Sequence, residues 1–431
     1  MPITKKSKVA IFGLGYVGLP LACLCVEKGY EVYGVDIDQR IVDMLNQDIC
    51  HINDTSLMEK ISNLKGKFIA TTDGLNAAKN TDIVLVCVPT PVDSTHRPNL
   101  TFVENATETI SKGLHRGQLI IIESTIYPGT TDNIVRPILE KSGLKAGIDF
   151  YLAHCPERLD PGNKKWTIEN LPRVVGGVNS VSTKKAAEFY RTILSAEVYE
   201  LNSVKAVEAV KITENAFRDI NIAFVNEMAK SFDKLGIDIM EVIKGASTKP
   251  FGYMPFYPGV GVGGHCIPVD PYYLIERGKE VGFEHKFLSL AREVNNSMPK
   301  YAIELITEAL NDIGKSIKGT KIAILGLAYK KDIDDTRESP SIEIVNELKK
   351  KGAILSVFDP LLPKMSTSDS LEHAIEECEC VVIATDHSEF KIMDSFDLKA
   401  KGVKILIDGR NMLDKEKIKK SGIIYKGIGR R

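Results

Sequence analysis

Lys8-Val-Ala-Ile-Phe12 runs directly into Gly13-Leu-Gly15-Tyr-Val-Gly18, and these residues are the most informative about the fold of the chain. The mostly apolar residues 8–12 predict a short buried strand, and the apolar run after Gly18 predicts a helix that ends before Gly29. Glu31-Val-Tyr-Gly-Val-Asp36 predicts a second strand. Strand, glycine turn, helix and strand in this order are typical of a nucleotide-binding βαβ unit.

The glycines and the acid at the end of the second strand predict which nucleotide binds. Glycine allows a tight turn and lets a pyrophosphate approach the backbone at the helix N-terminus. Asp36 can accept hydrogen bonds from a ribose 2′-hydroxyl and repels a 2′-phosphate, which favours NAD over NADP. The alternative is a structural turn with glycines by chance, and Arg40 leaves some room for NADP.

Outward from this unit, short apolar segments alternate with helical patterns, which indicates parallel sheets covered on both faces. Further strands are expected at residues 81–88, 119–123, 150–154, 321–325, 354–358, 380–384 and 404–408. Between the two groups of strands, residues 203–235 predict one long helix, and more helix follows on either side of a Gly- and Pro-rich loop at 248–271.

We therefore expect an α/β fold with two Rossmann-like doubly wound parallel-sheet domains, joined by a long central helix and a helical middle domain. The expected domain boundaries are residues 1–200, 201–315 and 316–431.

The composition is ordinary for a soluble globular protein and excludes several classes. The 431 residues carry 56 Lys+Arg and 57 Asp+Glu, a net charge of −1, which indicates neither a nucleic-acid binder nor a membrane-surface protein. No segment approaches about 18 uninterrupted apolar residues. The eight cysteines are scattered and include no Cys-x-x-Cys, which argues against a disulfide framework and a redox pair. We expect a cytoplasmic protein with reduced thiols.

Two motifs carry side chains suited to catalysis. Lys211, Asn215 and Arg218 recur at i, i+4 and i+7 on the long helix, where they can polarise a substrate oxygen or simply form a solvated face. Gly261-Val-Gly-Gly-His265-Cys266 ends in a cysteine, and Asp270 follows four residues later. This pattern suits an activated nucleophile, whereas the alternative is a buried and inert cysteine.

Strand ends supply the remaining candidates, because ligands of open α/β sheets bind beyond the carboxyl ends of the strands. Glu157 is either a general base or a capping or salt-bridged residue, and Ser124-Thr125 can hold a water. Lys330 is either a phosphate ligand or a surface lysine. The His-Cys pairs at 154–155 and 265–266 lack zinc-ligand spacing, so no metal is expected.

Taken in order along essentially the whole chain, these motifs resemble the UDP-glucose/GDP-mannose dehydrogenase family, and most of all its UDP-N-acetylhexosamine branch. The stretches that carry the resemblance are Gly13-x-Gly15-x-x-Gly18, Val88-Pro-Thr90-Pro, Ser124-Thr125, Pro156-Glu157-Arg158, Lys211-x-x-x-Asn215, Gly263-Gly-His-Cys266, Lys330-x-x-x-Asp334-Asp-x-Arg337-Glu-Ser and Asp408-Gly-Arg410. The resemblance implies oxidation of the sugar C6 alcohol to a carboxylate, with two NAD+ reduced. It also implies an NAD-binding first domain, a dimerisation and catalytic middle domain and a UDP-sugar-binding last domain.

The resemblance also implies roles for the catalytic residues. Cys266 attacks the aldehyde formed by the first hydride transfer, and the thiohemiacetal becomes a thioester that water hydrolyses. Lys211 and Asn215 stabilise the oxyanions, and Asp270 manages the protons of the thiol and the water. Glu157 serves the hydrolysis of the thioester.

By the same resemblance, Thr125 positions the hydrolytic water. The implied NAD contacts are Gly13, Gly15, Tyr16, Val17, Gly18, Asp36, Arg40, Thr90 and Arg337. The implied UDP-sugar contacts are Arg158, Leu159, Arg218, Lys249, Tyr257, Gly263, His265, Tyr329, Lys330 and Arg410. Lys249 matches a basic position that reaches the substrate from a neighbouring subunit, which implies a homodimer built on the long helix, or a larger oligomer.

The sugar is indicated by residues around the cysteine. His265 and Val269 stand where members acting on UDP-glucose tend to carry Ser and Lys. Residues 248–258 resemble the UDP-N-acetylglucosamine branch, and Val260 departs from a Pro common in relatives. We expect UDP-N-acetylglucosamine, for surface polysaccharide or glycan precursors, with UDP-N-acetylmannosamine and then UDP-glucose as alternatives.

Two other functions compete with this hypothesis. A two-electron hydroxyacid dehydrogenase also pairs a glycine turn with a Lys-x-x-x-Asn helix, but it leaves Cys266 and the third domain unexplained. A non-enzymatic NAD-binding regulator or scaffold needs no polar catalytic set, whereas this chain carries the whole set.

Overall fold

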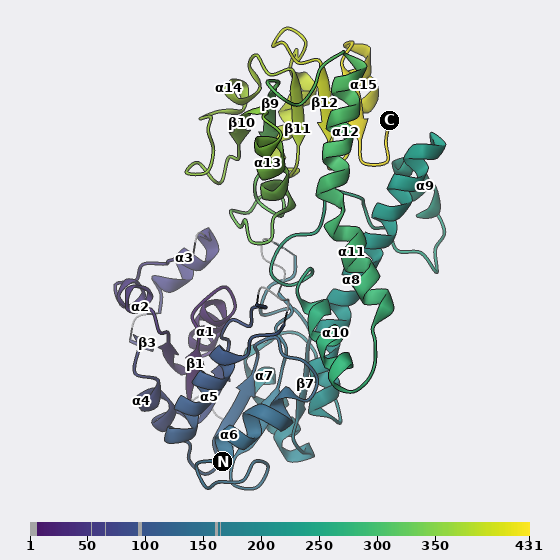
Figure 1. Cartoon of the computed structure of the whole chain (residues 1–431). Coiled ribbons are helices and arrows are strands. Elements are labelled where there is room, and N and C mark those ends of the chain that lie inside the picture. The colour runs from purple at the N-terminus through teal and green to yellow at the C-terminus, as the bar shows by residue number, and fades with distance from the viewer. Residues whose placement is uncertain (1–6, 53, 65, 94–96, 160–162, 164) are drawn as a thin grey trace. The chain divides into compact units, whose positions relative to one another are not determined.

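A computed structural model describes residues 7–52, 54–64, 66–93, 97–159, 163 and 165–431 of the chain. The chain divides into two compact units, residues 1–214 with 272–282 and residues 215–271 with 283–431. Figure 1 colours the path by residue number. The long helix α8 (Val204–Leu235) contains one of the points at which the chain passes between the units.

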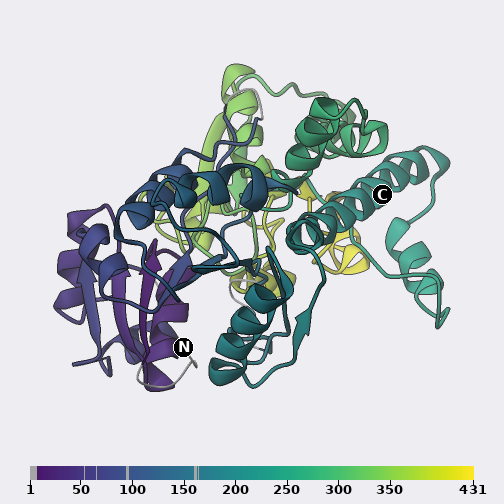
Figure 2. The same cartoon turned by 90° about the horizontal axis from the view of Figure 1, so that it is seen from below.

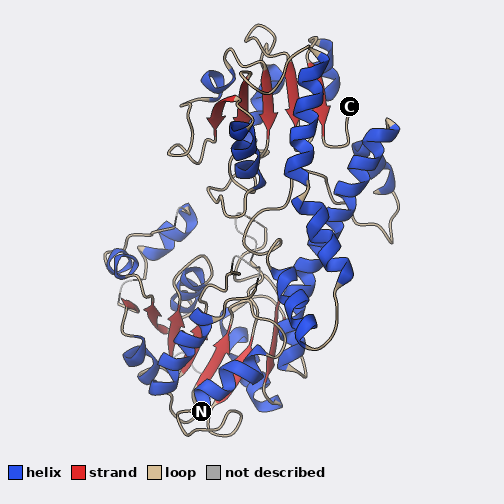
Figure 3. Cartoon of the chain, in the orientation of Figure 1, coloured by secondary structure: helices blue, strands red, loops and turns tan. Residues whose placement is uncertain are grey.

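Within the described residues, the first unit is built on an eight-stranded sheet in the order β3-β2-β1-β4-β5-β6-β7-β8, drawn as red arrows in Figure 3. Its strands are β1 (Lys8–Phe12), β2 (Glu31–Val35), β3 (Phe68–Thr71), β4 (Ile83–Val86), β5 (Leu119–Ile122), β6 (Tyr151–His154), β7 (Arg173–Gly177) and β8 (Val198–Glu200). Strands β6 and β7 pair antiparallel, and the other named neighbours are parallel. The order reverses between β1 and β4, so their carboxyl ends form the expected ligand edge.

Helices cover both faces of this sheet, as Figure 2 shows. Helices α1 and α7 share one apolar core with alternate residues of β1, such as Val9 and Ile11, while α5 lies over the other face. The helices of this unit are α1 (Gly18–Glu27), α2 (Gln39–Asn46), α3 (Thr55–Ile61), α4 (Gly74–Lys79), α5 (Thr101–Gly113), the π-helix η1 (Thr131–Val135), α6 (Arg136–Glu140) and α7 (Ser180–Ile193).

The second unit contains, within its described residues, a five-stranded parallel sheet in the order β10-β9-β11-β12-β13. Its strands are β9 (Lys321–Leu325), β10 (Ile354–Phe358), β11 (Cys380–Ile383), β12 (Ile405–Asp408) and β13 (Ile424–Gly427). The remaining helices are α9 (Ile239–Ala246), α10 (Asp270–Glu280), which begins in this unit and continues in the first, α11 (Lys286–Asn296), α12 (Met298–Asp312), α13 (Pro340–Lys350), α14 (Leu371–Ile375), the 3-10 helix η2 (Ser388–Ser395) and α15 (Lys415–Lys420).

The two sheets begin with the same turn. The Gly13 N–H donates to the carbonyl oxygen of Val35 over 2.8 Å, and the Gly326 N–H donates to that of Phe358 over 2.8 Å. The φ angles of the two glycines are +90° and +89°, in the region that favours glycine. In both units, a tight turn therefore follows the first strand at the carboxyl edge of the sheet.

The predicted fold class is confirmed, and the long helix differs from its predicted range by one residue at its start. The sheet of the first unit is not wholly parallel, because β7 runs against β6. Strands β3, β7, β8 and β13 were not predicted, since they are short and lack a long apolar run. The predicted domain boundaries stay a prediction.

Candidate active site

The glycine turn of the first unit leaves its backbone open to a ligand. A Cβ at Gly18 would lie 1.9 Å from the carbonyl oxygen of Gly13, so this close packing requires glycine. Among the described residues, no atom outside the turn lies within 4 Å of a Cβ placed at Gly15. Tyr16 is half-exposed beside it, and Val17 leads into α1, which has no acid in its first turn. This open helix N-terminus fits a pyrophosphate.

Asp36 is held in place at the end of β2. Its Oδ2 accepts the Leu14 N–H over 3.0 Å, and its Oδ1 accepts the Asp38 N–H over 3.0 Å. Each oxygen keeps a lone pair for a ribose hydroxyl, so Asp36 and the glycine turn together fit NAD. Arg40 is exposed, and its hydrogen bonds to Asp38 hold the pKa of that carboxyl at about 2.

Two more residues lie at this edge. The Thr90 carbonyl oxygen accepts the hydroxyl of Tyr273 over 2.6 Å, which fixes the loop after β4. His51, which the sequence analysis did not single out, lies near Asp36, and burial lowers the pKa of its imidazole although Asp36 opposes that change. A single histidine in a loop carries no motif that could have identified it.

Glu157 and Lys211 lie together beyond the carboxyl ends of β5 and β6. The Glu157 carboxylate is mostly buried, and its Oε2 lies 3.7 Å from the Nζ of Lys211, a residue only 6% exposed. Glu157 also accepts the N–H of Leu159. Thr125 is half-buried next to Ser124, whose hydroxyl is anchored on the loop after β4. A carboxylate beside an ammonium can move a proton to or from a water or hydroxyl.

Arg158, which was predicted to bind substrate, is held by Glu214. Its Nη2 and Nε donate to the two carboxylate oxygens of Glu214 over 2.6 and 3.2 Å, and its Nη1 donates to the carbonyl oxygen of Pro172 over 2.8 Å. The neighbouring Leu159 packs against the apolar core. A sugar contact from Arg158 therefore competes with Glu214.

A buried ion pair behind Glu157 was not found from the sequence. Because β7 is antiparallel to β6, its first residue, Arg173, lies at the carboxyl edge of the sheet. Its Nη1 lies 3.4 Å from the Oε2 of Glu123, and both side chains are fully buried. Burial raises the pKa of Glu123, against the opposing effect of Arg173. No local pattern reveals this pair, since 50 positions separate its members.

The glycine-rich loop of the second unit packs tightly against the turn that follows β9. Gly261 and Gly264 have φ angles of +137° and +88°, and the Gly264 N–H donates to the carbonyl oxygen of Arg337 over 2.9 Å. A Cβ at Gly263 would lie 2.5 Å from that of Tyr329. Glycine at these positions therefore brings the loop against Tyr329 and Arg337.

Cys266 ends this loop with its side chain half-exposed. Its Sγ lies 3.4 Å from the Nε2 of His265, and its carbonyl oxygen accepts the Asp270 N–H over 2.8 Å. Asp270 is buried at the start of α10 and accepts a hydrogen bond of 2.5 Å from the Nδ2 of Asn215 on α8. The structure thus brings three predicted catalytic residues, Cys266, Asp270 and Asn215, close to one another.

The predicted uridine and phosphate contacts lie at the carboxyl edge of the second sheet. Arg410 donates from Nη2 to the carbonyl oxygen of Tyr329 over 3.4 Å and from Nε to that of Ala384 over 3.1 Å, and burial lowers the pKa of its guanidinium. Lys330 is half-buried beside Tyr329. Two cationic side chains, Arg410 and Lys330, suit a diphosphate. Arg337, which was predicted to contact NAD, forms an ion pair of 2.5 Å with Asp335.

Besides His265 in the Cys266 loop, three predicted substrate residues are exposed. Arg218 lies on the exposed face of α8, and Tyr257 is 59% exposed in the loop after α9. The Nζ of Lys249 lies 5.1 Å from the ring centroid of Phe251. This exposure is what a contact with a second subunit would require.

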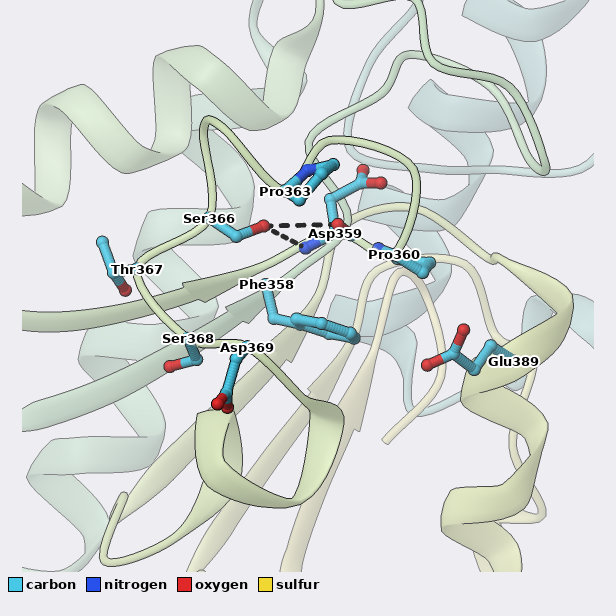
Figure 4. Close-up of a pocket in the computed structure, with 9 residues that line it drawn as sticks. All are labelled: Phe358, Asp359, Pro360, Pro363, Ser366, Thr367, Ser368, Asp369 and Glu389. Carbon is cyan, nitrogen blue, oxygen red and sulfur yellow. Dashed lines mark hydrogen bonds between the residues drawn. The ribbon is translucent and has the colours of Figure 1, made fainter. Parts of the chain in front are cut away.

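Two pockets of the second unit include none of the predicted site residues. One, of about 550 Å³, opens beyond β10 and is shown in Figure 4, where Ser366 and Asp359 hydrogen bond to each other on one wall. The other, of about 410 Å³, lies behind the glycine-rich loop and is lined in part by Gly261 and Pro340. The volumes of these two cavities therefore do not identify the place of the predicted site residues.

Among the described residues, no three His, Cys, Asp or Glu side chains are grouped closely enough to hold a metal ion. No helix of that part of the chain combines the length and the apolar character needed to cross a membrane.

Comparison with known proteins identifies three matching segments. Residues 7–194, 205–297 and 323–415 match the NAD binding domain, the central domain and the UDP binding domain of the UDP-glucose/GDP-mannose dehydrogenase family.

Individual relatives match over nearly the full length. A UDP-N-acetyl-D-mannosamine dehydrogenase of Pyrococcus horikoshii is 38% identical, over 98% of this chain and 99% of its own. A UDP-N-acetyl-D-glucosamine 6-dehydrogenase of Pseudomonas aeruginosa is 36% identical, over 96% and 99%. The solved structure of a UDP-D-ManNAc dehydrogenase from Pyrococcus horikoshii matches with a TM-score of 0.91 at 36% identity, covering 98% of this chain and 99% of that one.

Proposed function

Because this chain belongs to the UDP-glucose/GDP-mannose dehydrogenase family and is an NAD-dependent UDP-sugar dehydrogenase, we propose that it oxidises C6 of a UDP-N-acetylhexosamine to a carboxylate. The observation that carries this proposal is the half-exposed thiol of Cys266, close to His265 and Asp270 at the end of a loop packed on Tyr329. A nucleophile at this place distinguishes a four-electron oxidation from a two-electron one.

The oxidation of a primary alcohol to a carboxylate removes four electrons. One sugar, two NAD+ and one water give one uronate, two NADH and three protons. When bound, NAD+ accepts the hydride that C6 loses in each oxidation. The turn from Gly13 to Gly18 would hold its pyrophosphate, and Asp36 its adenosine ribose.

Cys266 would keep the aldehyde on the enzyme between the two oxidations. Its sulfur bonds to C6, the thiol proton ends on the former carbonyl oxygen, and a thiohemiacetal results. Loss of a hydride from C6 and of a proton from the hydroxyl then gives a thioester. Lys211 and Asn215 would stabilise the oxyanion at each addition, because an ammonium and an amide N–H both favour developing negative charge.

Hydrolysis of the thioester would use Glu157. A water held by Thr125 adds to the thioester carbon, its proton passes to the Glu157 carboxylate, and the C–S bond breaks to return the Cys266 thiol. Glu157 is mostly buried, and its Oε2 lies 3.7 Å from the Nζ of Lys211, so an ammonium stands beside the group that would accept that proton.

We further propose a homodimer built on α8. Phe217 and Phe224 lie seven residues apart on one face of this helix and are 47% and 56% exposed, and Phe251 after α9 is 71% exposed. Exposed aromatic residues on one face favour an interface between copies. The eight free cysteines support a cytoplasmic location, where thiols stay reduced.

We propose UDP-N-acetylglucosamine as the sugar, because residues 248–258 resemble the branch that acts on it, while His265 fits the N-acetylhexosamine group generally. The 38% identity to the enzyme named for UDP-N-acetyl-D-mannosamine supports that epimer as a second candidate.

The test is the number of NADH released per sugar consumed. Purified protein with excess NAD+ is given UDP-glucose and the UDP derivatives of N-acetylglucosamine, N-acetylmannosamine and N-acetylgalactosamine. Two NADH on one N-acetylated sugar is expected. One NADH per sugar, or none with any of the four, contradicts the proposal.

A further inference from the structure

The buried pair of Glu123 and Arg173 holds the backbone on both sides of one peptide. Arg173 Nη1 donates to the carbonyl oxygen of Pro156 over 3.4 Å, and the N–H of Glu157 donates to the carbonyl oxygen of Glu123 over 3.3 Å. The Pro156–Glu157 peptide is therefore fixed from β7 on one side and from the end of β5 on the other.

This pair is poorly explained as a source of stability. Both side chains are fully buried, and a buried ion pair often stabilises a fold no more than apolar residues of the same size. Among the described atoms, the Nε and Nη2 of Arg173 have no hydrogen-bond partner. A guanidinium placed only for stability would use more of its five N–H groups.

The charge of Glu157 also acts on both members of the pair. Burial alone would lower the pKa of Arg173, but the carboxylate of Glu123, and less strongly that of Glu157, raise it. The same Glu157 charge contributes to the raised pKa of Glu123, after burial as the main cause. Glu157 thus lies within electrostatic reach of both members of the pair.

We propose that Arg173 is a positioning residue, which acts through Glu123 and the Pro156 carbonyl to aim the Glu157 carboxylate at the water that hydrolyses the Cys266 thioester. Arg173 itself lies in the core and does not take the proton. This inference rests on the proposed function, and it adds that the hydrolysis of the thioester depends on Arg173 more than the two oxidation steps do.

The experiment separates the oxidation steps from the hydrolysis in Arg173→Lys. Both bonds come from Nη1 of Arg173, and lysine keeps the charge on a shorter side chain, so its ammonium cannot bond Pro156 and Glu123 in the same geometry. Enzyme is mixed rapidly with NAD+ and the UDP-sugar that the wild type uses. Stopped flow then records the NADH burst, and intact mass after acid quench records the acyl adduct on Cys266.

We expect steady-state turnover to fall about 10- to 100-fold, because a shift of about 1 Å at a reacting group has effects of this size. The burst should stay near two NADH per active subunit, and the fraction of Cys266 carrying the adduct should rise above that of the wild type. A purely structural role would instead lower burst and turnover together, with no added adduct, and this result would overturn the inference.

Two variants keep the test decisive. Tyr190→Phe removes a hydrogen bond to Glu123 but leaves the bond from Arg173 to Pro156, so its adduct fraction should match the wild type. If Arg173→Lys does not fold, Arg173→Met combined with Glu123→Gln removes both charges at once and should accumulate the same adduct. An unchanged adduct fraction in that folded double variant also overturns the inference.

Failure of the proposed function is visible in the wild type itself. One NADH per sugar in the wild type contradicts both the proposed function and the inference. Two NADH per sugar in the wild type, with no added Cys266 adduct in the variants, contradicts the inference alone.

Discussion

Asn215 and Asp270 are 55 positions apart in sequence, yet the side-chain amide of one donates to the carboxylate of the other over 2.5 Å. Both residues are buried, and each was predicted to take part in catalysis. The bond joins α8 to the start of α10 beside the Cys266 loop.

Asn215→Leu should weaken both folding and turnover. The variant leaves the buried Asp270 carboxylate without this donor, which lowers the free energy of unfolding by about 1–3 kcal/mol. Loss of the amide as an oxyanion donor should lower kcat by roughly 100-fold. Urea titration and steady-state kinetics check both numbers. Asn311→Ala, at an exposed position of α12, serves as the control and should change neither.

Cys266→Ala should abolish steady turnover to the acid. Without the sulfur no thioester forms, so at most the first two electrons leave C6 and the aldehyde escapes. The measurement is uronate formed per NADH. Cys50→Ala, at another partly buried free cysteine, should behave like the wild type. Normal uronate production by the Cys266 variant would rule out covalent catalysis.

Asp36→Asn should shift the choice of cofactor. The neutral amide loses a charged hydrogen bond to the ribose, worth about 1.5–3 kcal/mol, so kcat/KM for NAD+ should fall roughly 10- to 100-fold. The repulsion of a 2′-phosphate is relieved, so kcat/KM for NADP+ should rise. Asp43→Asn, exposed on α2, should leave the ratio unchanged.

His154 should make the protein lose stability in mild acid. Its ring is fully buried, and burial lowers its pKa from 6.5 to about 3. Between these values the unfolded chain binds a proton that the folded chain does not. This contribution is therefore absent above pH 6.5 and destabilises the fold by up to about 1.4 kcal/mol per pH unit as the pH falls toward 3.

His154→Phe should flatten that part of the pH profile, because neither ring nitrogen has a hydrogen-bond partner among the described residues. Urea unfolding at several values between pH 4 and pH 8 measures the slope, compared with His285→Gln at a partly buried loop position before α11. Parallel profiles for His154→Phe and the wild type would show that His154 does not cause the acid sensitivity.

Phe224→Glu should separate the proposed dimer. A carboxylate on the exposed face of α8 would have to be desolvated in an interface, at a cost of several kcal/mol. Light scattering after size exclusion should show a wild-type dimer or larger species and a smaller variant. Ile148→Glu, at an 82% exposed position before β6, should keep the wild-type mass.

Local patterns predicted the glycine turn, the central strands and α8, because each depends on neighbours in sequence. They did not predict β7, whose antiparallel pairing places Arg173 at the carboxyl edge of the sheet. They also did not predict the hydrogen bond from Gly264 to Arg337 or the ion pair between Arg158 and Glu214. These contacts depend on how distant segments pack, and a sequence pattern carries no record of such packing.

The matching turns at Gly13 and Gly326 have a consequence for engineering. One backbone turn is used twice, and the residue two positions after the glycine differs: Gly15 in one copy, open to a ligand, and Ala328 in the other. The third position is a tyrosine in both copies, Tyr16 and Tyr329. In such a protein, the few residues that follow the glycine distinguish two turns with the same backbone. Exchanging those residues between the two turns is therefore a route to altering which nucleotide each turn accepts, without redesigning either sheet.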